Sequence, residues 1–133
     1  MTGEQLERML TDDGWPFEKL DDHTWRSGFK SEGQEPFRMF VRTTSNWLVL
    51  TIVPFVTAPA DDADALALFR RMLELNREIT LAKLALDKRD VILTVELPLE
   101  GLQASQLKDG LDAMVFYANS HHAELSSLAK LGA

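Results

Sequence analysis

The spacing of hydrophobic residues predicts a chain that begins with a helix and continues into strands. A capping box formed by Thr2 and Gln5, followed by a shared apolar face, predicts a first helix that ends near Gly14. Four strand-like runs follow at residues 15–17, 25–29, 37–42 and 47–53. The last run is apolar on both pleat faces, which predicts a central strand covered on both sides.

The second half of the chain is predicted to hold two further helices with a hairpin between them. These elements span about residues 63–76 for the first helix, 84–86 and 91–97 for the hairpin strands, and 105–131 for the last helix. We interpret Asn76 as the residue that ends the first of these helices, since asparagine tolerates the left-handed conformation. The order α-β-β-β-β-α-β-β-α predicts an α+β fold with helices packed on a mostly antiparallel sheet, and we expect residues 1–133 to form a single domain.

The helix predicted at residues 63–76 has a broad apolar face. A step of about 100° per residue places its charged side chains on one arc and its apolar side chains on the opposite half. The apolar half consists of Ala65, Leu66, Leu68, Phe69, Met72, Leu73 and Leu75. One sheet does not cover so broad a face, and each large apolar side chain left in water forgoes about 1.5–3 kcal/mol. We therefore expect a second covering surface, either another helix of the same chain or a second copy of the protein across a two-fold axis.

Composition and charge exclude several classes of protein. With 45% hydrophobic and 26% charged residues among 133, the chain has the composition of a folded globular protein. Its formal net charge of −7 opposes binding to a phosphate backbone, so we expect no nucleic acid partner. The sequence has no cysteine, which excludes disulfides and thiolate sites. No secretory signal and no membrane-spanning run is visible, so we expect a cytoplasmic protein without membrane contact.

No residue pattern is specific for catalysis, for a cofactor or for a metal. His121 and His122 project about 100° apart on a helix, so they do not chelate one ion together. Glu96 and Glu100 are an acid–base pair only if the fold holds them across a cleft, which their spacing does not show. The glycines and serines match neither a phosphate-binding loop nor a nucleophile elbow. We therefore expect no enzyme, and a small enzyme that uses scattered carboxylates or histidines is the least favoured alternative.

Three segments of the chain resemble a known family. Their sequences are MLELN at residues 72–76, LAKLALD at residues 81–87 and VELPLEGL at residues 95–102. These segments resemble the YbjN-like family, described as "putative bacterial sensory transduction regulators". That family is similar in fold to the type III secretion chaperones of the CesT and Tir-chaperone kind.

The resemblance implies a small homodimeric α+β protein that binds other polypeptides and has no chemistry of its own. In the secretion chaperones a helix between the strands forms the dimer contact, and apolar patches on the sheet hold an extended segment of the effector. The residues expected at the dimer contact are therefore Leu66, Phe69, Met72 and Leu73. Those expected in a partner groove are Trp15, Trp25, Phe29 and Phe37. The alternative implied by the YbjN branch is a regulatory protein in signalling or motility with an unknown effector.

Overall fold

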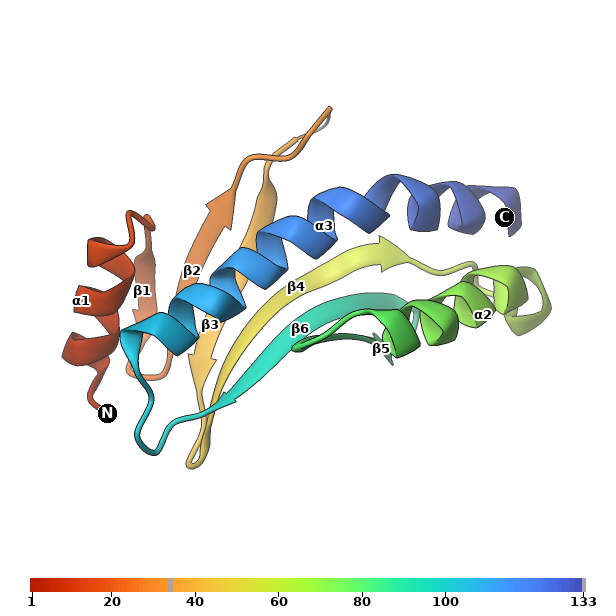
Figure 1. Cartoon of the computed structure of the whole chain (residues 1–133). Coiled ribbons are helices and arrows are strands. Elements are labelled where there is room, and N and C mark those ends of the chain that lie inside the picture. The colour runs from red at the N-terminus through yellow and green to blue at the C-terminus, as the bar shows by residue number, and fades with distance from the viewer. Residues whose placement is uncertain (34, 133) are drawn as a thin grey trace.

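The computed structural model describes residues 1–33 and 35–132, in which three helices accompany one six-stranded sheet (Figure 1). The helices are α1 (Gly3–Asp12), α2 (Asp62–Glu78) and α3 (Ala104–Gly132). The strands are β1 (Glu18–Asp21), β2 (Thr24–Phe29), β3 (Phe37–Thr43), β4 (Trp47–Thr57), β5 (Ala82–Asp87) and β6 (Asp90–Pro98). The predicted α+β fold and the predicted order of elements are confirmed.

The sheet is antiparallel throughout, with the strand order β1-β2-β3-β4-β6-β5. The first four strands are neighbours in the sheet in the order in which they follow one another along the chain. After β4 the chain leaves the sheet through α2 and returns as the edge strand β5, so that β6 inserts between β5 and β4. The sheet therefore has two edges, β1 at one end and β5 at the other.

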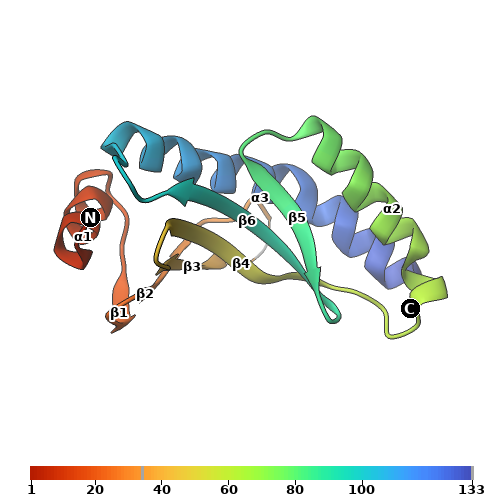
Figure 2. The ribbon, with the colours of Figure 1, turned by 90° about the horizontal axis from the view of Figure 1, so that it is seen from below.

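All three helices lie on the same side of the sheet. The long helix α3 runs across β4 and β6, and α2 lies beside the C-terminal half of α3 and next to β5 (Figure 2). The short helix α1 covers Trp25 of β2, whose indole Nε1 donates a hydrogen bond to Glu7 at 2.8 Å. Within residues 1–33 and 35–132, no helix covers the other side of the sheet.

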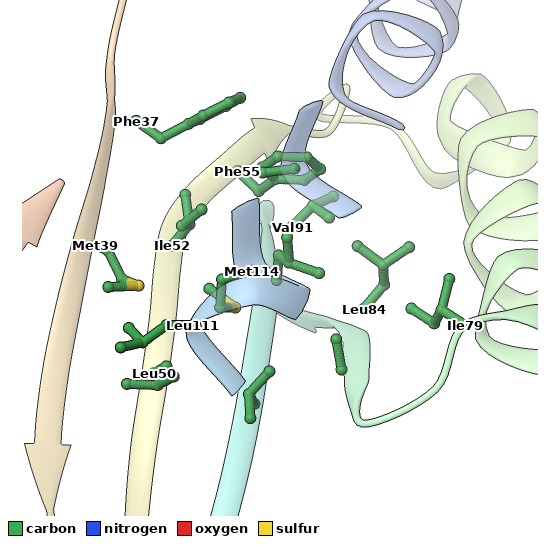
Figure 3. Close-up of a cluster of buried hydrophobic side chains, with 14 of the residues drawn as sticks. Phe37, Met39, Leu50, Ile52, Phe55, Ile79, Leu84, Val91, Leu111 and Met114 are labelled. Atoms are coloured by element: carbon green, nitrogen blue, oxygen red, sulfur yellow. The ribbon is translucent and has the colours of Figure 1, made fainter. Parts of the chain in front are cut away.

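The core lies between α3 and the centre of the sheet. Apolar residues that recur at helical spacing form a buried stripe along α3, and the members of this stripe are Leu107, Leu111, Met114, Ala118 and Leu125. Leu111 and Met114 point toward the side chains of β4 (Figure 3). Gly110 lets α3 approach closely, because a Cβ at this position would lie 3.2–3.3 Å from side chains of β4 and β6. Phe116 points away from the sheet, as its position off the stripe predicts.

The predicted helix starts are confirmed. Thr2 and Gln5 form the expected capping box, with the Thr2 hydroxyl accepting from the Gln5 N–H and the Gln5 side chain accepting from the Thr2 N–H. Asp61 caps α2 by accepting a hydrogen bond from the Ala63 N–H at 2.8 Å. Local sequence signals of this kind are reliable because both partners lie within one turn of the chain.

Three local predictions are wrong. The first strand begins only at Glu18, because Trp15 is still hydrogen-bonded to the end of α1 and Pro16 has no N–H to give to a ladder. Asn76 does not end α2, which continues to Glu78, and its side chain is hydrogen-bonded to β5 instead.

The third wrong prediction concerns β4, which is covered on one side only. Leu48, Leu50 and Ile52 are buried under the helices, whereas the alternate residues Val49 and Val53 are half-buried on the other side. An apolar residue on each pleat face is typical of a strand buried on both sides, but here one of those faces contacts solvent.

Candidate functional surfaces

The exposed side of α2 carries two leucines with little cover. Leu66 is 67% exposed and Leu73 is 73% exposed. They are seven residues apart, which places them two turns apart on the same side of the helix. Arg70 and Arg77 are exposed on the same side. We call Leu66, Arg70, Leu73 and Arg77 the outer stripe of α2.

The rest of α2 is held firmly by its own chain. Arg71 donates from Nε to Glu124 of α3 at 2.9 Å, and Arg89 of the β5–β6 turn donates to Asp62 at 2.7 Å. The Arg89 guanidinium also lies over the Phe69 ring, 5.6 Å from its centroid. These contacts anchor α2 to α3 and to the hairpin, so the outer stripe is presented by an ordered helix.

The four residues expected at a dimer contact are therefore divided by the structure. Leu66 and Leu73 are exposed, Phe69 is half-buried beneath Arg89, and Met72 is buried within the chain. α3 and the sheet cover one part of the broad apolar face, whereas Leu66 and Leu73 of the outer stripe are left uncovered by residues 1–33 and 35–132. Met72 is not available for contact with a second molecule in this conformation.

Three of the four residues expected in a partner groove lie in one row of aromatic rings. The ring centroids of Trp15 and Phe29 are 5.8 Å apart, those of Phe29 and Phe37 are 5.4 Å apart, and those of Phe37 and Phe55 are 5.8 Å apart. His122 of α3 completes the row, with its ring edge-on to both Phe37 and Phe55. Trp15 and Phe29 at one end and His122 at the other are partly exposed, whereas Phe37 and Phe55 between them are buried, so the row is mainly a packing feature.

Trp25 and Phe37 are core residues, which corrects their expected role. Trp25 has no exposed surface under α1, and Phe37 is buried between Phe29 and Phe55. Their alternation with polar residues places both on one side of the sheet, but an aromatic residue suits a covered side and a binding surface alike. A partner that contacts the folded protein meets Trp15 and Phe29, not these two residues.

His122 is the ionisable group most affected by its surroundings. Burial against Phe37 and Phe55 lowers the pKa of His122, and the nearby Lys130 lowers this pKa further, while a hydrogen bond with the Phe55 backbone raises it. Ser126, one turn further along α3, lies 3.4 Å from Nε2. His121 instead stacks on Tyr117, so the two adjacent histidines lie in different environments, as expected.

The side of the sheet without helices forms a second candidate surface, which we call the open face. Its centre consists of Phe40, Val49, Thr51, Val53, Ile92 and Thr94. The Thr51 and Thr94 hydroxyls lie 3.1 Å apart, and Thr94 donates to the Leu50 carbonyl at 3.0 Å, so these polar groups are satisfied within the sheet. A shallow hollow of about 520 Å³ lies over this centre.

The two carboxylates considered as an acid–base pair do not form a shared site. Glu96 lies on the open face, where it is paired with Lys83, and Glu100 lies in the turn after β6. In the described part of the chain, no group of three or more histidine, aspartate or glutamate side chains is arranged to hold a metal ion. No helix among residues 1–33 and 35–132 has the length and hydrophobicity required to cross a membrane.

The sequence of this chain matches the profile of a known protein family. The profile of the YbjN family, "Putative bacterial sensory transduction regulator", matches residues 2–125. The chain belongs to the YbjN family. No curated protein sequence matches the chain.

Solved structures of the YbjN family and of secretion chaperones share this fold. The crystal structure of YbjN from E. coli, "a putative transcription regulator", is 14% identical, with a TM-score of 0.67 over 91% of each chain. A chain of the heterodimeric ExoU–SpcU complex from the type III secretion system of Pseudomonas aeruginosa is 17% identical. Its TM-score is 0.62 over 94% of this chain and 98% of that one.

A third structure is the Yersinia pestis type III secretion chaperone SycH in complex with a fragment of YscM2. It is 17% identical, with a TM-score of 0.51 over 88% of this chain and 96% of that one. The resemblance expected from residues 72–102 is therefore confirmed, and this member of the YbjN family has the fold of type III secretion chaperones.

The sequence analysis of this YbjN family member missed the residues of the open face. Phe40, Val49 and Val53 were assigned no functional role, because an apolar residue on the second pleat face of a strand is typical of burial. The sequence signal for exposure is the pair Arg38 and Arg42. They lie two residues before and two residues after Phe40 on β3, so they share its side of the sheet. Charged residues are rarely left unpaired in a core, so this alternation indicates a solvent-facing side.

Proposed function

We propose that this protein is a non-enzymatic protein-binding module that acts as a homodimer and holds another polypeptide on its surface. The observation that carries the proposal is the outer stripe of α2, where Leu66 and Leu73 are exposed on one side of a well-anchored helix. Burial of a Leu side chain is worth about 1.5–3 kcal/mol, so covering both is a substantial gain for an association. The expected cytoplasmic location and the single domain stay predictions.

The contact that suits this stripe best is a second copy of the same helix across a two-fold axis. In such an isologous contact each surface meets its own equivalent, so Leu66 of one copy can meet Leu73 of the other. The exposed Glu74, beside Leu73, is then available to the arginines of the opposite stripe. The solved complexes that share this fold join two different proteins, so they support the binding of another polypeptide and not the two-fold contact.

Light scattering on the purified protein tests the dimer. We expect a dimer for the natural protein, and we expect Leu73→Glu to shift it toward the monomer because a buried carboxylate at the contact is strongly unfavourable. Leu20→Glu is the matched control, since Leu20 is an exposed leucine of β1 at the far edge of the sheet. A monodisperse natural monomer contradicts the dimer, as does an equal effect of the two substitutions.

The second function is regulatory, and the family match favours it. The YbjN family is described as a sensory transduction regulator, and the same surfaces would then contact a signalling component in place of a secreted client. Affinity purification from the native cell under matched conditions separates the two roles. Recovery of a secretion substrate supports a chaperone, and recovery of a signalling or motility protein supports a regulator.

A further inference from the structure

Three arginines surround Phe40 on the open face. Arg38 and Arg42 are two positions before and after Phe40 on β3, so all three side chains project to the same side of the strand. Arg26 of β2 lies directly opposite Phe40 in the strand register. The next residue of β2 on this side is Gly28, opposite Arg38, which leaves that part of the surface without a side chain. We call Arg26, Arg38, Phe40 and Arg42 the arginine cluster.

The cluster is unusual in its pairing. Arg26 is paired with Glu18 of the neighbouring strand β1, at an exposed site. Among residues 1–33 and 35–132, no ion pair involves Arg38 or Arg42. Two guanidinium groups beside an apolar ring therefore have no carboxylate partner within the described chain.

The basic residues of the open face are separated from most of its acidic residues. Arg26, Arg38 and Arg42 lie on β2 and β3, whereas Asp87, Asp90 and Glu96 lie on β5 and β6. With Lys83, Glu18 and Glu35, which lines the hollow at Arg38, this side has four basic and five acidic residues, a net charge of −1. A carboxylate is therefore attracted locally, to the part of the face formed by β2 and β3.

The surface around the cluster is hollowed rather than flat. One hollow lies over Arg26, Gly28 and Arg38, another over Arg38, Phe40 and Val53, and the hollow at the centre of the open face includes Phe40 and Arg42. Neighbouring hollows share Arg38, Phe40 or Val53, so they adjoin one another along β3, and we call this row of hollows the groove.

From this arrangement we infer that the groove binds an extended acidic segment of a partner protein, with an apolar side chain between two carboxylates. In an extended chain, alternate residues face the same side and are about 6.6–6.8 Å apart. A segment with the spacing acidic-x-apolar-x-acidic, running along β3, therefore places its carboxylates at Arg38 and Arg42 and its apolar side chain on Phe40. Arginine suits this role because its guanidinium binds a carboxylate through two parallel hydrogen bonds. This inference rests on the proposed protein-binding function and names the chemistry of the partner.

Fluorescence anisotropy with short labelled peptides tests the inference. The first probe contains glutamate, threonine, leucine, threonine and glutamate in that order at its centre. The second has the same composition with the two glutamates adjacent, the third has glutamine in place of glutamate, and the fourth has lysine. We expect only the first probe to bind tightly, even though net charge alone favours the lysine probe. Salt is expected to weaken the binding of the first probe.

Two double variants with the same change in charge separate the groove from general electrostatics. Arg38→Gln with Arg42→Gln removes both unpaired arginines, and we expect about a tenfold loss of affinity for the first probe. Arg8→Gln with Lys130→Gln removes two exposed cations of α1 and α3 that lie outside both the arginine cluster and the outer stripe, and we expect no more than about a twofold change. Circular dichroism confirms that both variants are folded.

Several results would overturn the inference. Equal losses in the two double variants mean that only net charge matters. Binding of the glutamine or lysine probe as tight as that of the first removes the acidic preference but leaves the protein-binding function standing. A dimer that persists while no probe binds rejects the groove alone. A shift from dimer to monomer in the variant at Arg38 and Arg42 shows that the groove is occupied by a second copy of this chain.

Discussion

The side chain of Asn76 in α2 is hydrogen-bonded to both backbone groups of Leu84 in β5. Its Nδ2 donates to the Leu84 carbonyl at 2.8 Å, and its Oδ1 accepts from the Leu84 N–H at 2.7 Å. Because β5 is an edge strand, these are the backbone groups that a further strand would use. Asn76 therefore closes this edge, whereas every residue of β1 at the other edge is exposed.

The Asn76 contact gives the first prediction. We expect Asn76→Ala to lower the free energy of unfolding by about 1–2 kcal/mol, because both backbone groups of Leu84 lose their partner. Urea denaturation measures this change, and Asn46→Ala, at an exposed turn residue, is the control. We also expect more concentration-dependent aggregation from the unprotected edge. Equal midpoints for the two variants would show that the contact contributes nothing.

The second prediction concerns pH and His122. Since burial lowers the pKa of His122 in the folded state, the unfolded chain takes up this proton at a higher pH than the folded chain does. The contribution to stability is therefore complete above the ordinary histidine pKa of about 6.5 and is lost as the pH falls below it. Urea midpoints measured from pH 7.5 to 5.5 are expected to decline in the natural protein.

The control for this pH dependence is a pair of histidine substitutions. His122→Leu removes the titrating group but keeps an apolar side chain against Phe37 and Phe55, so we expect a flatter decline with falling pH. His23→Gln changes an exposed histidine and should leave the decline as it is. If the urea midpoint of the His122 variant falls with pH as steeply as that of the natural protein, groups other than His122 cause the decline.

The third prediction tests how closely α3 approaches the sheet at Gly110. A Cβ there already lies 3.2–3.3 Å from Leu50, Val95 and Leu97, so a branched side chain has no room. We expect Gly110→Val to lower the free energy of unfolding by about 1–3 kcal/mol, as overpacking does. Valine has a higher helix propensity than glycine, so propensity alone predicts a gain in stability at this position. Ala104→Val, at the exposed start of the same helix, is the control for a valine without tight packing contacts. An equal or higher free energy of unfolding in the Gly110 variant would contradict the close approach.

The fourth prediction concerns Arg89, which joins the β5–β6 turn to the start of α2. Its Nη1 donates to Asp62 and to the Ala60 carbonyl, and its guanidinium covers Phe69. We expect Arg89→Met to increase amide exchange at residues 58–64 while exchange in the core strands stays slow, because this connection is released locally. Lys88→Met, at the exposed neighbouring position, is the control. Uniform acceleration across the chain would instead indicate a global loss of stability.

Much of the fold can be predicted from the sequence because its signals are local. The capping box at Thr2 and the stripe through Leu111 and Met114 each depend on residues within a turn or two of one another. The role of Asn76 cannot be obtained in this way, because it depends on a strand that reaches the helix only after the chain has folded.

The candidate surfaces were harder to predict, for a different reason. Alternation on β2 and β3 shows that Trp25 and Arg26, or Phe37 and Arg38, face opposite sides, but it does not show where the helices lie. An aromatic residue suits a core and a binding surface equally well. The packing of α1 and α3 shows that Trp25 and Phe37 are interior, and it places Phe40 on the other side, which Arg38 and Arg42 mark as solvent-facing.

Because every described helix lies on one side of the sheet, the arrangement affects how many partner segments a dimer could bind. A pair of molecules joined along α2 would leave both open faces in solvent, so a dimer would offer two equivalent grooves. A client with two suitable segments on a linker of the right length would then engage both at once. The second attachment would be intramolecular, and weak individual contacts would combine into tight capture.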